Sequence, residues 1–306
     1  MSVNTINDAY VYGQEVMGRA NRRLGTLLVG SPEDLRFRAF FGVSAEVAVE
    51  AWGMMAEHNF LPPNPNFLHY LWALAFMRLY PTNDTVLSAM LGGKVPKTTF
   101  WIDRNCGKKM MIVVFILLFI RLQLNFHFEP QIKFENRKEG DVGRDCLLLV
   151  DGTDFRIAMG YRKVFWSYKF KKSGLRYEVG LCIKTGSICW WSGPYAPGKW
   201  NDLAIFRDSL VSMLEQGERC ETDRGYQGAA PAYVKCPGVV EADPKTAAIQ
   251  SRVRSRQETV NERFKNWAIL STVYRHDFLE HQTVFGAIVV LTQLSFVANP
   301  LFQVAY

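Results

Sequence analysis

Acidic residues stand at three places in this chain where they could hold divalent metal ions. Asp151 follows a short apolar stretch that is typical of a buried strand, and Asp223 ends a second strand-like stretch. A later predicted helix carries both Glu258 and Glu262 on its polar face, and its pattern leaves the choice between them open. Carboxylates suit Mg or Mn ions, because these ions prefer oxygen ligands and keep several waters.

A site of this kind would carry out phosphoryl transfer. One ion would activate the attacking hydroxyl or water, and a second, about 3.5 to 4 Å away, would stabilise the leaving oxygen. Taken singly, each acid could instead be a cap, a turn residue or part of a solvated face, and Asp151-Gly152 is also a common turn pair. Asp154 would point to the opposite face of a continued strand from Asp151, so it is excluded from the predicted site.

A basic and aromatic segment without acidic residues extends from residue 155 to residue 177. Cations that neutralise phosphates, interleaved with rings that stack on bases, are typical of a nucleic-acid groove. The alternative is a solvated basic hairpin with buried rings. The candidate DNA-contacting residues in this segment are Arg156, Lys163, Lys169, Lys171, Lys172 and Arg176.

A sheet covered by helices is needed to bring these residues together. From residue 144 onward the patterns predict an α/β domain, 144–306, in which both Asp151 and Asp223 stand at carboxyl ends of strands, where α/β sheets bind ligands. Two further strands are predicted at 175–183 and 187–192. Helices are predicted at 202–216, capped by Asn201, at 245–270 and at 283–298.

The N-terminal part is predicted to be helical. Residues 1–36 show no clear pattern, whereas residues 37–104 place apolar residues at helical spacings. Residues 82–100 have a helix-turn-helix outline, whose second helix, beginning near Lys97, would enter the DNA major groove; a helical hairpin that only packs is the alternative. Residues 105–143 are predicted to form an atypical apolar segment and a polar linker. The apolar run of eleven residues is too short for a bilayer, which takes about 20.

The composition is that of a globular protein, with 306 residues of which 48% are hydrophobic. The formal net charge of +7 favours an anionic partner such as nucleic acid, without identifying it. The six cysteines form no CxxC pair, so free thiols in a reducing compartment are expected. No signal-peptide pattern, Walker loop or nucleophile motif is present, so secretion, a membrane role and serine or cysteine hydrolysis are not expected.

Motifs in the second half of the chain resemble the DDE-type transposase-derived nucleases of the PIF/Harbinger group. The matching pieces occur in the family's order and cover about residues 140 to 300. They are Val150–Thr153, Phe165–Phe170, Asp223–Tyr226 and Arg256–Lys265. The 34 residues between Asp223 and Glu258 are similar to the separation of the last two acids in that family.

The resemblance implies an RNase H-like core, an α/β fold with a mixed sheet and helices, preceded by an all-helical region that contains a helix-turn-helix. It implies Asp151, Asp223 and Glu258 as the catalytic, metal-binding carboxylates, with Glu262 as a fallback. We therefore expect a nuclear, two-metal Mg- or Mn-dependent endonuclease or transposase that cleaves double-stranded DNA.

A Myb-like DNA-binding partner often accompanies such proteins, while strand transfer and homo-oligomerisation are left open. The alternatives are a transposase-derived DNA-binding or interaction protein that no longer cleaves, and a relic that does not fold. The chain departs from the family at residues 105–134, which lack the expected amphipathic helix, and at Tyr168, where relatives often have His.

Overall fold

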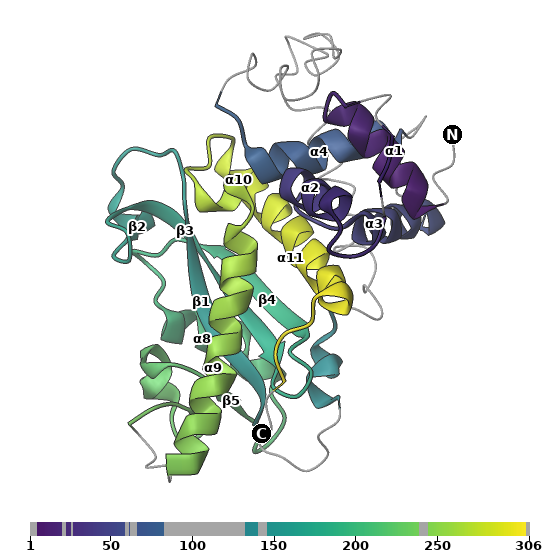
Figure 1. Ribbon diagram of the computed structural model, residues 1–306. Coiled ribbons are helices and arrows are strands. Elements are labelled where there is room, and N and C mark those ends of the chain that lie inside the picture. The colour runs from purple at the N-terminus through teal and green to yellow at the C-terminus, as the bar shows by residue number, and fades with distance from the viewer. Residues whose placement is uncertain are drawn as a thin grey trace. The chain divides into compact units, whose positions relative to one another are not determined.

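The computed structural model describes residues 5–19, 23–25, 27–58, 61, 66–82, 132–139, 146–238 and 244–303 (Figure 1). The chain divides into two compact units. The helical unit comprises residues 1–126, 266–269 and 283–295, and the sheet unit comprises residues 127–265, 270–282 and 296–306.

The helical unit contains α1 (Ile6–Val16), α2 (Pro32–Phe41), α3 (Ala45–Glu57) and α4 (Phe67–Leu79). Each of the four begins at a Thr, Ser or Asn residue whose side chain accepts a hydrogen bond from a backbone N–H of the first turn. Gly42 ends α2 with a φ of 82°, and a Cβ there would lie 2.7 Å from the Trp267 ring.

The structure revises the expected helix boundaries in this unit. α1 and the start of α2 lie within residues 1–36, for which no pattern was apparent, and a break at Gly42 separates α2 from α3. α3 and α4 lie in the region of residues 37–104 that was predicted to be helical. The helix-turn-helix predicted for residues 82–100, Lys97 and the apolar run of residues 110–120 lie outside the described residues.

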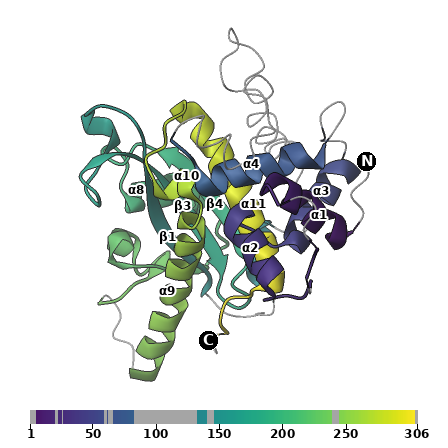
Figure 2. The ribbon, with the colours of Figure 1, turned by 45° about the horizontal axis from the view of Figure 1, so that its top comes forward.

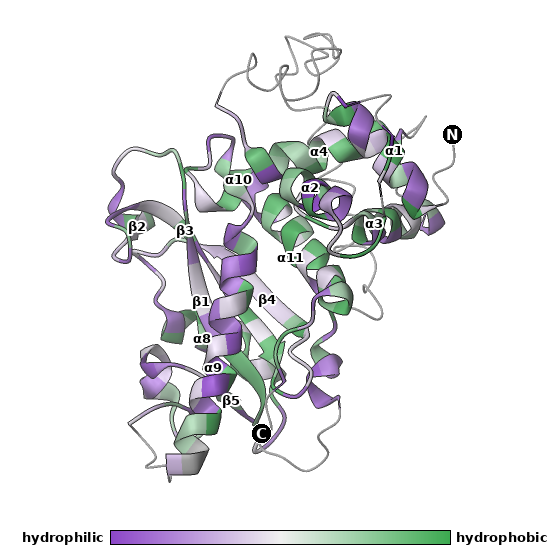
Figure 3. Cartoon of the chain, in the orientation of Figure 1, coloured by the Kyte–Doolittle hydropathy of each residue, from purple (hydrophilic) through white to green (hydrophobic). Residues whose placement is uncertain are grey.

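The helix α11 (His281–Ala298) contributes most of its length to the helical unit. It is mostly hydrophobic, in contrast to α9 (Pro244–Lys265), as Figure 3 shows. Helix Phe278–Ala298 is long and apolar enough to cross a membrane, but 61% of its most apolar stretch is buried inside the protein. This burial is typical of a core helix of a globular protein.

The sheet unit is built on a mixed sheet, as expected for the predicted α/β class. Its strands, within the described residues, are β1 (Cys146–Arg156), β2 (Trp166–Ser167), β3 (Lys172–Cys182), β4 (Ile188–Tyr195), β5 (Arg219–Glu221) and β6 (Val234–Lys235). The order is β2-β3-β1-β5-β6, and β4 also pairs with β3. β1 is antiparallel to β3 and parallel to β5, which is in turn parallel to β6.

Helices cover both faces of this sheet. Val150 of β1 packs in one core cluster with Phe206 of α8 (Asp202–Ser209). The next residue, Asp151, is bonded to Asn261 of α9. Because neighbouring residues of a strand point to opposite faces, α8 and α9 lie on opposite sides of β1. Figures 1 and 2 both show α9 running along the sheet.

Several predicted elements of this unit are found, with different ends. The strands predicted at 175–183 and 187–192 correspond to β3 and β4, and Asn201 caps α8, with its Oδ1 accepting a hydrogen bond from the Ala204 N–H at 2.8 Å. The helix predicted at 202–216 ends at Ser209 and is followed by the short η3 (Val211–Met213). The helix predicted at 245–270 ends at Lys265, before α10 (Ala268–Ser271).

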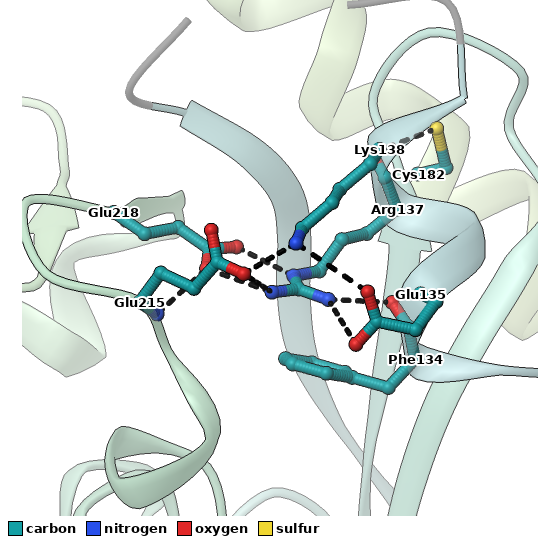
Figure 4. Close-up of polar contacts among 7 residues, drawn as sticks. All are labelled: Phe134, Glu135, Arg137, Lys138, Cys182, Glu215 and Glu218. Atoms are coloured by element: carbon teal, nitrogen blue, oxygen red, sulfur yellow. Dashed lines mark hydrogen bonds and ion pairs between the residues drawn. The ribbon is translucent and has the colours of Figure 1, made fainter. Parts of the chain in front are cut away.

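A short helix, η1 (Phe134–Lys138), packs against the sheet unit, although its residues were predicted to belong to a linker. The Arg137 side chain is 1% exposed and donates hydrogen bonds to Glu218 Oε1 at 2.7 Å and Oε2 at 3.1 Å (Figure 4). Its guanidinium carbon also lies 3.8 Å from the centre of the Phe134 ring. These contacts tie η1 to the turn that precedes β5.

Candidate active site

Asp151 lies inside β1 and not at its end, because β3 pairs with β1 as far as Arg156. The parallel pairing of β1 with β5, however, stops at Leu149 and Glu221. Asp151 thus still lies just beyond the carboxyl end of the parallel part of the sheet. The prediction that β1 ends at Asp151 is therefore wrong. Asp151 still lies at the predicted carboxyl edge of the sheet, because the neighbouring strand β5 is shorter than β1.

Asp223 follows β5 and begins the short helix η4 (Arg224–Ala229). Its Oδ1 accepts a hydrogen bond from the Gly225 N–H at 2.7 Å, and its Oδ2 accepts none within the described part of the chain. Burial and the negative charge of Asp223 raise the pKa of Asp151 to about 6. The two carboxylates are therefore close enough to repel each other, and a cation beside them would relieve that repulsion.

Helix α9 supplies a side chain that is not among the residues predicted for this site. Asn261 is 8% exposed, and its Nδ2 donates a hydrogen bond to Asp151 Oδ2 at 3.0 Å. The Asn261 Oδ1 is buried without a hydrogen-bond partner. The sequence feature that could have pointed to Asn261 is its position on the polar face of the predicted helix, three residues after Glu258.

Glu258 lies on α9 one turn before Asn261. Its side chain is exposed and forms no hydrogen bond or ion pair with any described residue. Among the described residues, no three carboxylate, imidazole or thiolate side chains converge closely enough to hold a metal ion. The structure thus brings Asp151 and Asp223 together, and it leaves Glu258 exposed on the helix that contacts Asp151.

The donor atoms at this edge suit Mg or Mn. Asp151 and Asp223 offer carboxylate oxygens, and Asn261 offers an amide oxygen, which are the ligand types that these ions prefer. Asp223 Oδ2 forms no hydrogen bond within the described residues, and Asn261 Oδ1 is a buried oxygen without a hydrogen-bond partner. The residues present therefore fit a divalent ion.

Comparison with known proteins places this edge in a family context. Residues 150–293 match the family model of the DDE superfamily endonucleases. The matched segment begins at the residue before Asp151 and includes Asp223, Glu258 and Asn261. DDE superfamily nucleases generally use divalent metals, and the match indicates a transposase-like nuclease domain. Neither a curated protein nor a solved structure matches the chain.

Within the segment that matches this family model, Asp154 faces away from Asp151, as predicted. Its carboxylate accepts hydrogen bonds from the Arg176 guanidinium at 2.7 and 3.0 Å and from Ser167 Oγ at 2.6 Å. The Arg176 Nη1 also pairs with Asp202 Oδ1 at 2.9 Å. Two carboxylates of the protein itself thus hold the Arg176 guanidinium, and its contact with DNA stays a prediction.

Most of the other predicted DNA-contacting residues are exposed to solvent. Exposed lysines lie along the segment from η2 (Lys163–Phe165) through β2 to the start of β3. They are Lys163, Lys169, Lys171 and Lys172. Arg156 is half-buried and donates to the Ser271 carbonyl oxygen at 3.2 Å. Tyr161 and Tyr168 are 73% and 78% exposed, so their rings are open to a ligand, contrary to a hairpin with buried rings.

Lys169 links this basic segment to the acids. Its charge lowers the pKa of both Asp151 and Asp202, against the larger effect of burial. Burial lowers the pKa of Lys265, near the end of α9; the charge of Lys169 lowers it further, and that of Asp151 raises it. A lysine of the exposed segment thus lies within electrostatic reach of the paired acids.

Proposed function

We propose that the sheet unit is a metal-dependent DNA endonuclease of the transposase type, in which Asp151, Asp223 and Glu258 hold two Mg or Mn ions. The observation that carries this proposal is the pair of repelling carboxylates, Asp151 and Asp223, at the carboxyl edge of the parallel strands in a segment that matches DDE superfamily endonucleases. When bound, the ions would supply activation of the attacking hydroxyl or water and stabilisation of the leaving oxygen.

The protein's own side chains have distinct roles in this proposal. Asn261 holds Asp151 in one orientation through its hydrogen bond, as residues around metal ligands commonly do. Glu258 supplies the third carboxylate from α9, where its exposed side chain has no hydrogen bond or ion pair with the residues that the structure describes. Lys169 neutralises a phosphate next to the acids, so that the scissile bond lies over Asp151 and Asp223.

The substrate that best fits these features is double-stranded DNA. Four exposed lysines and two exposed tyrosines lie on one continuous stretch of chain, and such cations bind the phosphate backbone without reading sequence. We extend the proposal to a nuclear protein of the PIF/Harbinger type that acts with a Myb-like partner or as a homo-oligomer. This extension is supported by the motif resemblance and the family match.

Nicking of supercoiled plasmid by the purified chain in the presence of Mg or Mn tests the proposal. Asp151→Asn, Asp223→Asn and Glu258→Gln should each lower the nicking rate at least about a hundredfold, the usual cost of losing one group that stabilises the transition state. Glu262→Gln tests the fallback acid on the same helix and should nick like the original protein. Asp208→Asn, an exposed acid on α8, is the control and should also nick like the original protein. Nicking by Asp151→Asn at the original rate would overturn the assignment.

A non-cleaving, transposase-derived DNA-binding protein is the second candidate. It is favoured by the absence, among the described residues, of three ligands that converge on a metal position. Such a protein would retard duplex DNA in a gel through its exposed lysines, yet show no heat of Mn binding and no nicking. Retardation together with nicking that depends on Asp151 would exclude it.

A further inference from the structure

Asp202, the first residue of α8, belongs to none of the motifs that carry the family resemblance. Its carboxylate lies over two glycines that neighbour the proposed metal ligands. A Cβ added to Gly152 would lie 2.7 Å from Asp202 Oδ1. A Cβ added to Gly225 would lie 3.3 Å from Asp202 Oδ2 and 2.9 Å from Asp223 Oδ1. The missing side chains of these glycines therefore provide the space that the Asp202 carboxylate occupies.

The two oxygens of Asp202 have different surroundings. Oδ1 is held by the Arg176 Nη1 at 2.9 Å, and Arg176 is anchored in turn by Asp154. Oδ2, on the side of Asp223, accepts no hydrogen bond from any described residue. One oxygen of Asp202 is thus fixed by the protein, and the other is available close to the Asp223 carboxylate, whose Oδ1 accepts the Gly225 N–H.

A second observation points to a ligand at this place. Glu178 is fully buried, and its Oε1 accepts a hydrogen bond from the Tyr226 hydroxyl at 3.1 Å, while its Oε2 has no partner. Glu178 stands directly opposite Gly152 in the β1/β3 pairing, so its side chain lies on the sheet face over which Asp202 lies. Burial, and then the negative charges of Asp202 and Asp151, raise the pKa of Glu178. A cation would compensate this concentration of acidic groups.

We propose that Asp202 is a fourth acid of the site, whose Oδ2 shares with Asp223 in binding a divalent cation while Arg176 holds Oδ1 in place. This inference rests on the proposed function, because it concerns a cation bound by Asp223, one of the proposed metal ligands. It also explains why glycine stands at positions 152 and 225, since a larger side chain at either position would crowd the Asp202 carboxylate.

Mn binding to the full chain, measured by calorimetry, tests the role of Asp202 without relying on cleavage. Asp202→Asn keeps the shape of the side chain and an oxygen for Arg176 but removes the charge. It should weaken Mn binding about tenfold to a hundredfold. Asp208→Asn, an exposed acid on the same helix, should bind Mn like the original protein. Thermal melts without metal should show that both variants remain folded.

A second variant guards against a folding defect of Asp202→Asn. Gly152→Ala leaves every carboxylate in the chain but displaces Asp202 Oδ1, so Mn binding should weaken as well. If Asp202→Asn binds Mn normally while Asp151→Asn does not, the role of Asp202 is refuted and the proposed function stands. If the original protein binds no Mn, both proposals fall.

Discussion

Replacing Arg137 with Met should destabilise the sheet unit by about 3 to 5 kcal/mol, the usual cost of removing one partner of a buried ion pair. The Arg137 and Glu218 side chains are 1% and 5% exposed, and the pair is bidentate, at 2.7 and 3.1 Å. Without Arg137 the Glu218 carboxylate would remain buried without its counter-ion. The hydrogen bond from Arg137 to the Phe134 carbonyl oxygen, at 3.0 Å, would also be lost.

Two controls separate this effect from a general loss of packing. The double variant Arg137→Met, Glu218→Met removes both charges, so it should regain most of the lost stability. Lys138→Met removes the neighbouring cation, whose side chain is 39% exposed and pairs with Glu135 at 3.4 Å. It should cost less than about 1 kcal/mol, as exposed ion pairs generally do.

Urea denaturation of the full chain, followed by circular dichroism at neutral pH, measures these differences. A loss below about 1 kcal/mol in Arg137→Met would refute the reasoning, because a buried, unpaired carboxylate costs more than that. A double variant no more stable than the single one would refute it as well.

Three further predictions concern the site and its surroundings. Asn261→Ala frees Asp151 to rotate, so calorimetry should show Mn affinity lowered about tenfold or more, while urea denaturation shows a loss of only about 1 kcal/mol. Gly225→Ala brings a Cβ within 2.9 Å of Asp223 Oδ1, so nicking should slow markedly, whereas Gly160→Ala, with open space around its Cβ position, should not affect it. Burial lowers the pKa of His281 to about 3, so between that value and about 6.5 the unfolded chain binds one more proton than the folded chain. The contribution of His281 to the unfolding free energy should therefore fall by up to about 1.4 kcal/mol per pH unit as the pH drops below about 6.5. Denaturation series should show this contribution as the difference in pH dependence between the original protein and His281→Gln.

The sequence by itself determined the local features of this protein. The strands near 175–183 and 187–192, the cap at Asn201 and the opposite directions of Asp151 and Asp154 follow from residue patterns, because alternation and capping act over a few neighbouring residues. The nearness of Asp151 and Asp223 could also be expected, since both were predicted at carboxyl ends of strands; in the structure both lie just beyond the parallel pairing of β1 with β5.

Only the tertiary structure decided which distant side chains meet. Asn261 contacts Asp151 across 110 positions of the chain, and Asp202 fills the space over Gly152 from a separate helix. Arg176 belongs to a basic segment, yet it turns inward, because its partner in the β1/β3 register is the acid Asp154. Such contacts depend on strand register and on the sheet face that each helix covers, and local patterns do not encode either of them.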